Sequence, residues 1–333
     1  MLKSTLKKML PTPVKTALAR ARNFTASSVS PVAQEVRFRR YYSRSPREEE
    51  CQKIRARLTF HAHSLEKGLS HTDIRFGFGE SALTQLAANM RQYRALGCDE
   101  SNRAFENALS VLDAYVTLHK DNGQPTDHVT ELFGTFVDEA AARKSPLGGT
   151  IPVRSADKAN NRKKDFEDLF RGRVSTREFA DEALDLALID EAIDIALKSP
   201  SVCNRQSSRV RVLTDPDEVD AVLKIQGGFT GYDTPPALLV ITSDIRDFIA
   251  LTERNQGYVD GGLFSMSLLL ALEYVGLAAC PLNTMFSYGS DKATRKLLGV
   301  EHEDFIMFIA VGPFAPEVAA PKSFRYTLED ITL

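Results

Sequence analysis

The sequence has few cysteines, and their spacing lacks the patterns of metal and disulfide sites. Its 333 residues include four cysteines, Cys51, Cys98, Cys203 and Cys280, and no tryptophan. No two of them form a Cys-x-x-Cys pair, which argues against a structural zinc site or a disulfide framework and favours reduced thiols in a cytoplasmic protein. We expect Cys203 and Cys280 to be buried fillers rather than nucleophiles, because no neighbouring base is evident.

A dinucleotide-binding fingerprint is also absent. No Gly-x-Gly-x-x-Gly follows a predicted strand, so the sequence predicts neither a Rossmann fold nor a permanently bound dinucleotide. No secretory signal is visible, and we expect no nucleic-acid partner. The hydrophobic fraction of 43% and the charged fraction of 26% are those of an ordinary globular protein. The length predicts about two domains.

Acidic residues are nearly absent from residues 1–47. This stretch holds eleven Lys or Arg residues and one acid, Glu35, a net charge of +10; because the whole chain carries −2, the remainder carries −12. Three interpretations of this arm stay open: a flexible solvated tail, an organelle transit peptide, or a basic amphipathic helix in weak contact with a membrane surface. The helix would use Leu2, Leu6, Met9, Leu10, Val14 and Leu18, but Pro11 and Pro13 interrupt it.

Residues 48–145 have the periodicity of helices. Apolar side chains recur at spacings of three and four: Ile54, Leu58, Leu65, Leu83, Leu86, Met90, Phe105, Leu109, Leu112 and Val116. This pattern predicts an antiparallel helical layer or small bundle, whose role the sequence does not reveal. Residues 146–163 are rich in turn-forming and polar residues, and we interpret them as a linker.

Two histidines in this helical region invite a metal interpretation. His61 and His63 are two positions apart, so on a helix they point to nearly opposite faces and cannot share one ion. We therefore predict no metal site. Instead, His63, Glu66, Lys67 and Arg75 are candidates for a polar patch that faces the second domain or a substrate.

Helices and strands alternate in residues 164–333. Periodicity predicts helices at 186–198, 215–225 and 257–275 and strands at 209–213, 237–242 and 304–311. The fold class is therefore α+β. Helix 257–275 is almost wholly apolar but contains Glu273, so we expect it to be buried against a sheet or a second subunit rather than to span a membrane.

Two polar stretches carry the candidate chemistry. Arg171, Arg173 and Arg177 alternate with Ser175 and Thr176, a cluster of donors suited to a phosphate. Residues 198–206 supply Asn204 and Gln206, whose amides can bind the edge of a heterocycle. Structural alternatives remain open, since Ser175 to Glu178 also fits a capping box and Ser199 to Ser201 also fits a helix stop.

The order of these stretches resembles the nitroreductase family of FMN-dependent oxidoreductases. Arg-x-Ser-x-Arg-x-Phe at 173–179 is followed by Ser-Pro-Ser-x-x-Asn-x-Gln at 199–206. Residues 260–283 are similar to the central helix of that family and the turn beside the flavin, and residues 321–325 to its closing basic motif. The resemblance covers the carboxyl-terminal half of the chain. It implies an FMN-binding sheet sandwiched by helices at 164–333, preceded by the helical region.

The resemblance also implies a set of cofactor contacts. They are Arg173, Ser175, Arg177, Pro200, Ser201, Asn204, Gln206, Pro281, Leu282, Asn283, Lys322 and Arg325. Arg173, Ser175, Lys322 and Arg325 would hold the phosphate and ribityl chain, and Arg177 would place positive charge near the pyrimidine edge of the reduced ring. No side chain is assigned as a catalytic acid or base.

The activity that the resemblance implies is transfer of hydride from NADH or NADPH, through FMN, to a nitroaromatic, quinone, enone or similar small acceptor. A specialised flavin reaction, such as dehalogenation or modification of a biosynthetic intermediate, and a non-catalytic scaffold are the alternatives. We expect a homodimer, or a monomer if the amino-terminal helices cover helix 257–275, located in the cytoplasm or peripherally at a membrane. Residues 226–232 would form either a lid, with Phe229 or Tyr232 stacking on an aromatic substrate or the nicotinamide, or a plain surface loop. Val174 and Ser207-Ser208 depart from the family pattern of a second basic residue and a Pro-Trp pair.

Overall fold

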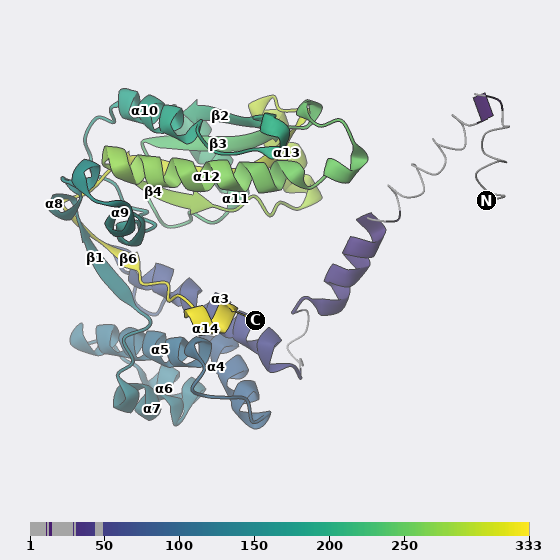
Figure 1. The fold of residues 1–333 in the computed structure, drawn as a ribbon. Coiled ribbons are helices and arrows are strands. Elements are labelled where there is room, and N and C mark those ends of the chain that lie inside the picture. Colours follow the sequence, from purple (N-terminus) through teal and green to yellow (C-terminus); the bar gives the residue numbers. More distant parts are fainter. Residues whose placement is uncertain (1–10, 12, 15–28, 30, 44–48, 333) are drawn as a thin grey trace.

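The computed structural model describes residues 11, 13–14, 29, 31–43 and 49–332. A helical bundle and a sheet unit are joined by a two-stranded ribbon (Figure 1). Residues 31–41 of the predicted basic arm are helical, with Arg39 paired to Glu35. Leu2, Leu6, Met9, Leu10 and Leu18, on which the membrane interpretation depends, lie outside the described residues.

The amino-terminal unit is a bundle, as its apolar periodicity predicts. Its helices are α3 (Cys51–Leu69), α4 (Glu80–Ala95), α5 (Arg103–Asp121), α6 (Asp127–Phe133) and α7 (Phe136–Arg143). The periodic side chains meet in one buried core that includes Leu58, Leu86, Met90, Tyr93, Phe105, Leu109 and Tyr115. Burial of an amphipathic face, rather than helix propensity, therefore stabilises these helices.

A disulfide closes one end of this bundle. Cys51, the first residue of α3, is bonded to Cys98, just beyond α4, with a Cα–Cα distance of 5.9 Å. The prediction that all four cysteines are reduced is therefore wrong for this pair. Spacing along the sequence did not reveal the bond, because the antiparallel packing of α3 on α4 creates the proximity. A cross-link over this separation is expected to stabilise the bundle by about 2–4 kcal/mol. The cytoplasmic location stays a prediction.

The carboxyl-terminal unit contains a four-stranded antiparallel sheet in the order β2-β3-β5-β4. Its strands are β2 (Ser208–Leu213), β3 (Ala237–Asp244), β4 (Leu277–Leu282) and β5 (Glu303–Pro313). Side chains of β3 alternate between two apolar layers: Leu239 faces one layer and Leu238 the other. The α+β prediction is confirmed. Strand β4 lies where the sequence predicted only a turn, because its short apolar run directly follows a long apolar helix.

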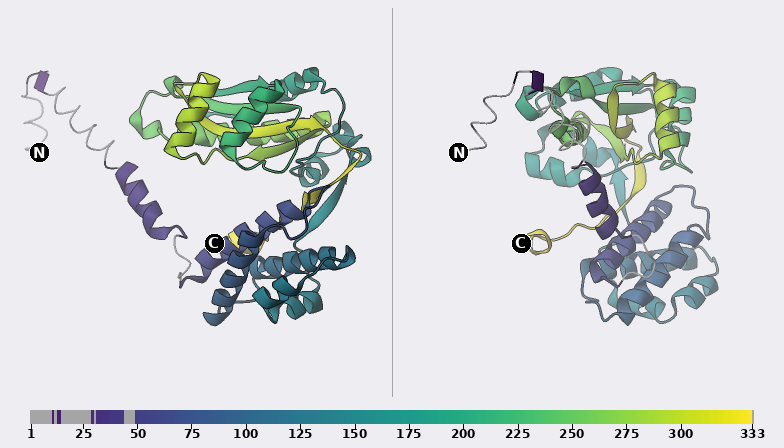
Figure 2. Two further views of the ribbon diagram at one scale, coloured as in Figure 1. Left: turned by 180° about the vertical axis from the view of Figure 1, so that it is seen from behind. Right: turned by 90° about the vertical axis from the view of Figure 1, so that its right-hand side faces the viewer.

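Helices cover both faces of this sheet. Helices α10 (Leu186–Ala196) and α12 (Gln256–Val275) pack on one face (Figure 1). Helices α11 (Pro216–Gln226) and α13 (Tyr288–Leu298) contribute to the core on the opposite face, seen from behind in Figure 2. Asp215 begins α11 by accepting hydrogen bonds from the amides of Asp217 and Glu218, and Pro216 occupies the first turn.

The predicted linker is instead structured. Residues 146–163 contain strand β1 (Thr150–Arg154), helix α8 (Ser155–Lys158) and the 3₁₀ turn η1 (Asn161–Lys163). Strand β1 pairs antiparallel with β6 (Glu317–Pro321), and this ribbon connects the two units in Figure 1. The sequence did not predict it because the partner strand is more than 160 residues away. The remaining elements are α9 (Phe166–Gly172), α14 (Leu328–Ile331) and the 3₁₀ turns η2 (Val202–Asn204), η3 (Ile245–Asp247) and η4 (Leu251–Glu253).

Helix α12 contains a buried ion pair. Its Glu273 is 2% exposed, and Oε1 lies 2.6 Å from Nζ of Lys158, which also donates to the carbonyl of Gly172. Asn161 donates to both the carboxylate and the carbonyl of Glu273. Among the described residues, only α12 is long and apolar enough to cross a membrane, but more than half of its apolar window is buried inside the protein. Its contacts are therefore those of a core helix.

Candidate active site

The arginine-rich stretch runs as extended chain beside β4. Ser175 forms a bridge with Ala279, and the amide of Thr176 donates to the carbonyl of Ala279 at 3.1 Å. Phe179 pairs with Phe314 at the other end of the stretch. No helix begins at Ser175, so the capping-box alternative is wrong. Side chains alternate along an extended chain, which places Arg173, Ser175 and Arg177 on one side.

These three side chains line a cavity of about 440 Å³, a volume within the range of small-molecule sites. The cavity is lined by Thr59, His63, Glu66, Asn107, Arg173, Ser175, Arg177, Pro281, Pro321, Ser323, Phe324 and Arg325. The structure thus brings together five of the predicted cofactor contacts: Arg173, Ser175, Arg177, Pro281 and Arg325. It also places side chains of the helical bundle opposite them.

Several buried polar atoms of this cavity lack a hydrogen-bond partner among the described residues. They include Nη1 of Arg173 and both Nε and Nη1 of Arg177. Burial lowers the pKa of the Arg173 guanidinium; Glu273 opposes this effect, whereas the nearby Arg325 adds to it. Buried cationic donors without partners are costly, and an anionic ligand would satisfy them. The cavity therefore has the electrostatics of a phosphate site.

Helix α3 contributes Thr59, His63 and Glu66 to the lining of this cavity. Oε2 of Glu66 lies 3.1 Å from Nδ1 of His63, which in turn lies 3.4 Å from Oγ of Ser323. The side chain of Arg103 donates to the carbonyl of Arg325 at 3.0 Å. The polar patch expected from the sequence therefore faces the second unit, and it contacts the predicted basic motif at 321–325.

Two further cavities continue along the seam between the units. The second cavity, of about 580 Å³, shares Arg177 with the 440 Å³ cavity and is also lined by His71, Glu178 and Tyr232. The third cavity, of about 410 Å³, is lined by Lys67, Arg75 and Tyr232 among others. Glu178 accepts a hydrogen bond from the amide of Thr72 at 2.8 Å, which ties the units together. Burial lowers the pKa of Lys67, and Arg177 lowers it further.

The expected lid at 226–232 is attached to the bundle. Phe229 is buried in the sheet core, so it cannot stack on a substrate. The ring of Tyr232 stacks on His71 at a centroid distance of 3.8 Å, and its hydroxyl donates to the carbonyl of Lys67 at 2.9 Å. Burial lowers the pKa of His71. Residues 226–232 therefore form a joint between the two units, and one face of Tyr232 is already occupied.

The second predicted stretch lies outside these cavities. Pro200, Ser201, Asn204 and Gln206 are absent from the linings of all three. Cys203, Asn204 and Gln206 have positive φ values of 48°, 56° and 52°, a conformation that is costly for side-chain-bearing residues. Cys203 is exposed, so the prediction that it is a buried filler is wrong. Cys280 is buried as predicted, and burial raises the pKa of its thiol.

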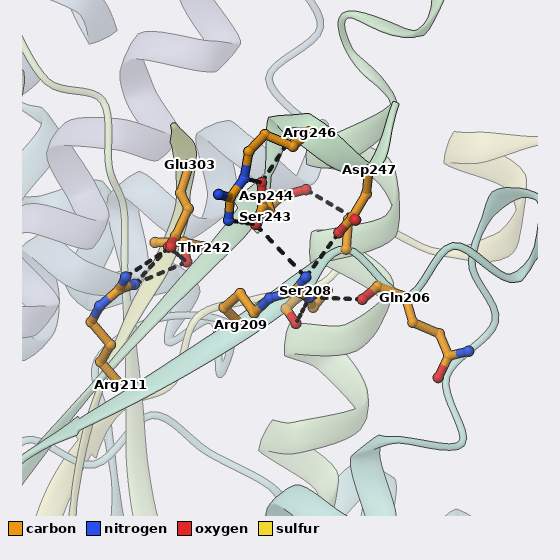
Figure 3. Close-up of polar contacts among 11 residues, drawn as sticks. Gln206, Ser208, Arg209, Arg211, Thr242, Ser243, Asp244, Arg246, Asp247 and Glu303 are labelled. Carbon is orange, nitrogen blue, oxygen red and sulfur yellow. Dashed lines mark hydrogen bonds and ion pairs between the residues drawn. The ribbon is translucent and has the colours of Figure 1, made fainter. Parts of the chain in front are cut away.

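A polar cluster holds the end of this stretch to the sheet. Arg209 donates to the carbonyl of Gln206 at 2.9 Å and pairs with Asp247, while the side chain of Gln206 points away from the cluster (Figure 3). Asp244 pairs with Arg246 at 2.7 Å, and hydrogen bonds from Arg246 lower the pKa of this carboxyl to about 2. The strained backbone is therefore anchored, and the side-chain amide of Gln206 donates to the carbonyl of Asn204 at 3.3 Å.

The other predicted contacts also lie away from the cavity lining. Leu282 is buried in the sheet core. Asn283 is exposed, and its carbonyl accepts a hydrogen bond from the side chain of Gln226. Lys322 is exposed, and its backbone amide donates to the carbonyl of Gly149. Arg171 pairs with Glu167, and Arg205 with Glu253. Arg171, which the sequence placed in the cluster of phosphate donors, is thus engaged elsewhere.

Sequence reasoning did not identify Thr59 and Asn107 as cavity residues or Lys158 and Glu273 as a buried pair. A weak signal existed for Thr59: it lies four positions before His63 and seven before Glu66, and therefore on the same helix face. No local signal identified the Lys158–Glu273 pair, whose members are 115 residues apart.

Known proteins are similar to part of this chain. Residues 170–230 match the model of the nitroreductase family, which confirms the resemblance over these residues. An FMN-dependent nitroreductase from Clostridium difficile R20291 aligns with 50% of this chain and 94% of its own, at 20% identity and a TM-score of 0.41. A nitroreductase family protein from Clostridium difficile 630 aligns with 51% of this chain and 98% of its own, at 18% identity and a TM-score of 0.42.

Proposed function

We propose that this chain is an FMN-dependent oxidoreductase, in keeping with the match of residues 170–230 to the nitroreductase family. It would take hydride from NADH or NADPH and reduce a small acceptor such as a nitroaromatic, quinone or enone. One observation carries the proposal. Buried guanidinium nitrogens of Arg173 and Arg177 have no hydrogen-bond partner among the described residues, and they belong to a cavity that Ser175 and Arg325 also line.

The residues of the cavity fit FMN. Arg173, Ser175 and Arg325 would bind its phosphate, because guanidinium groups and a hydroxyl supply donors to the phosphate oxygens. Pro281, on β4, would contact the ring. When bound, the flavin supplies the redox chemistry, and the protein positions it and adjusts its electronics.

Arg177 lies at the junction of two cavities and would act on both. Its guanidinium lines the 440 Å³ cavity and the neighbouring 580 Å³ cavity. A fixed, partly desolvated cation there would stabilise negative charge that develops during electron transfer. The neighbouring cavity, which Tyr232 and His71 line, would hold the nicotinamide and the acceptor in turn.

We also propose a homodimer. Tyr258, Val259 and Leu263 of α12 are about half exposed and form an apolar face. The stretch 200–206 adjoins it, since the amide of Val202 donates to Asp260 of the same helix. Val259→Asp is expected to convert a dimer to a monomer in sedimentation velocity, whereas Leu96→Asp, a change at a partly exposed leucine of the bundle, should not. A monomeric unmodified protein would contradict the proposal.

The visible spectrum of the purified protein tests the function directly. We expect flavin absorbance that bleaches when NADH or NADPH is added without oxygen and returns when an acceptor is supplied. Bound flavin that neither nucleotide bleaches would refute the proposed electron donor. A colourless protein that takes up no added FMN would refute the enzyme assignment and favour a scaffold role.

A further inference from the structure

We propose that the helical bundle completes the flavin site, with Glu66 and Thr59 of α3 accepting hydrogen bonds from the hydroxyl groups of the ribityl chain. The inference rests on the proposed function, since it names residues that hold the same cofactor. Both side chains lie outside residues 170–230, which match the family model. The bundle would thus be part of the active site.

The first support is the face that α3 presents. Thr59, His63 and Glu66 are spaced by four and three residues, so they share one side of the helix. All three line the 440 Å³ cavity that Arg173 and Arg325 also line. The side of α3 that carries Leu58 and Leu65 packs into the bundle core instead.

The second support is unsatisfied hydrogen-bonding capacity. Glu66 is 1% exposed, and only its Oε2 has a partner, His63; its Oε1 has none within the described part of the chain. Oγ1 of Thr59 and Oδ1 of the buried Asn107 are likewise without partners. A buried carboxylate oxygen is rarely left unpaired, because its desolvation is costly. Its place in a cavity lining indicates that a ligand supplies the missing donor.

The chemistry of that donor follows from the charge of Glu66. A carboxylate repels a phosphate and accepts hydrogen bonds only from O–H or N–H groups. The phosphate belongs with the cations Arg173 and Arg325 of the same cavity. The ribityl chain directly adjoins the phosphate and carries hydroxyl groups, so it is the part of FMN that matches the acceptors on α3.

Three flavins distinguish binding of the ribityl chain by α3 from binding of the phosphate by the arginines. FMN has a ribityl chain and a phosphate, riboflavin has only the chain, and lumiflavin has neither. Dissociation constants are measured by fluorescence titration for the full chain and its variants. Glu66→Gln is expected to weaken FMN and riboflavin alike, by about tenfold or more, and to leave lumiflavin unchanged. Thr59→Val, which removes one hydroxyl at nearly constant volume, should weaken the same two flavins by a few-fold.

Matched changes outside the cavity serve as controls. Glu80→Gln and Thr84→Val alter exposed residues of α4 and should leave all three constants unchanged. If Glu66→Gln does not fold, as judged by circular dichroism, Thr59→Val carries the test.

Each outcome has a distinct meaning. Equal FMN affinity in the unmodified protein and in both α3 variants would overturn the inference while leaving the proposed function intact. A loss of lumiflavin affinity matching that of riboflavin would overturn it too, because the acceptors would then contact the ring. If the unmodified protein binds none of the flavins, the proposed function itself fails.

Discussion

Replacing both Arg173 and Arg325 with alanine is expected to strip the protein of FMN while leaving it folded. Both arginines line the cavity, and Nη1 of Arg173 is buried with no partner in the part of the chain that the structure describes. Each charge-assisted contact to a phosphate contributes about 1.5–3 kcal/mol, so the double variant should bind FMN roughly a hundredfold to ten-thousandfold more weakly. Flavin content after purification and a fluorescence titration measure the loss.

A matched pair of arginines controls for the loss of charge. Arg154 and Arg171 are exposed and pair with Glu317 and Glu167 outside the cavity. Exposed pairs of this kind contribute about 0–1 kcal/mol to stability, so alanine at both positions should leave FMN affinity nearly unchanged. Full flavin occupancy in the Arg173 and Arg325 double variant would refute the phosphate assignment.

Lys158→Met is expected to destabilise the protein by about 3–5 kcal/mol, because it leaves the Glu273 carboxylate buried without its cation. Glu273 is 2% exposed, and Nζ of Lys158, 2.6 Å from its Oε1, also binds the carbonyl of Gly172. The free energy of unfolding in denaturant measures the effect. Gly172 precedes Arg173, so the same change should also loosen the start of the phosphate-binding stretch.

A double-mutant cycle separates the pair from the general effect of substitution. Lys158→Met combined with Glu273→Leu removes both charges and should cost much less than Lys158→Met alone, since no buried charge remains. Arg162→Met breaks an exposed pair with Glu191 and should cost less than about 1 kcal/mol. A single Lys158 variant as stable as the parent would show that Glu273 does not depend on this partner.

Elements with a strong local period were predicted well. The bundle helices α3, α4 and α5 follow from apolar spacings of three and four, and their periodic residues form the observed core. Strands β2, β3 and β5 were predicted near their observed positions. The ribbon of β1 and β6 was missed, because strand pairing over such a separation leaves no mark in either segment.

In the candidate site, too, the residues with a local pattern were predicted and those placed by packing between elements were not. Arg173, Ser175 and Arg177 alternate along extended chain, so the side they share follows directly from their spacing. The sequence could not show that residues 200–206 lie outside the cavity that the arginines line. Nor could it show that Glu66 is part of that cavity's lining. Both facts depend on how the bundle packs against the sheet.

The sequence by itself determined the α+β class, the amino-terminal bundle and the arginine motif, because periodicity and motif spacing are properties of neighbouring residues. Only the tertiary structure decided that Cys51 meets Cys98, that Lys158 pairs with Glu273, and that α3 and the arginines line one cavity. The physical reason is that these contacts join segments whose proximity arises from the packing of whole elements, which no local pattern encodes.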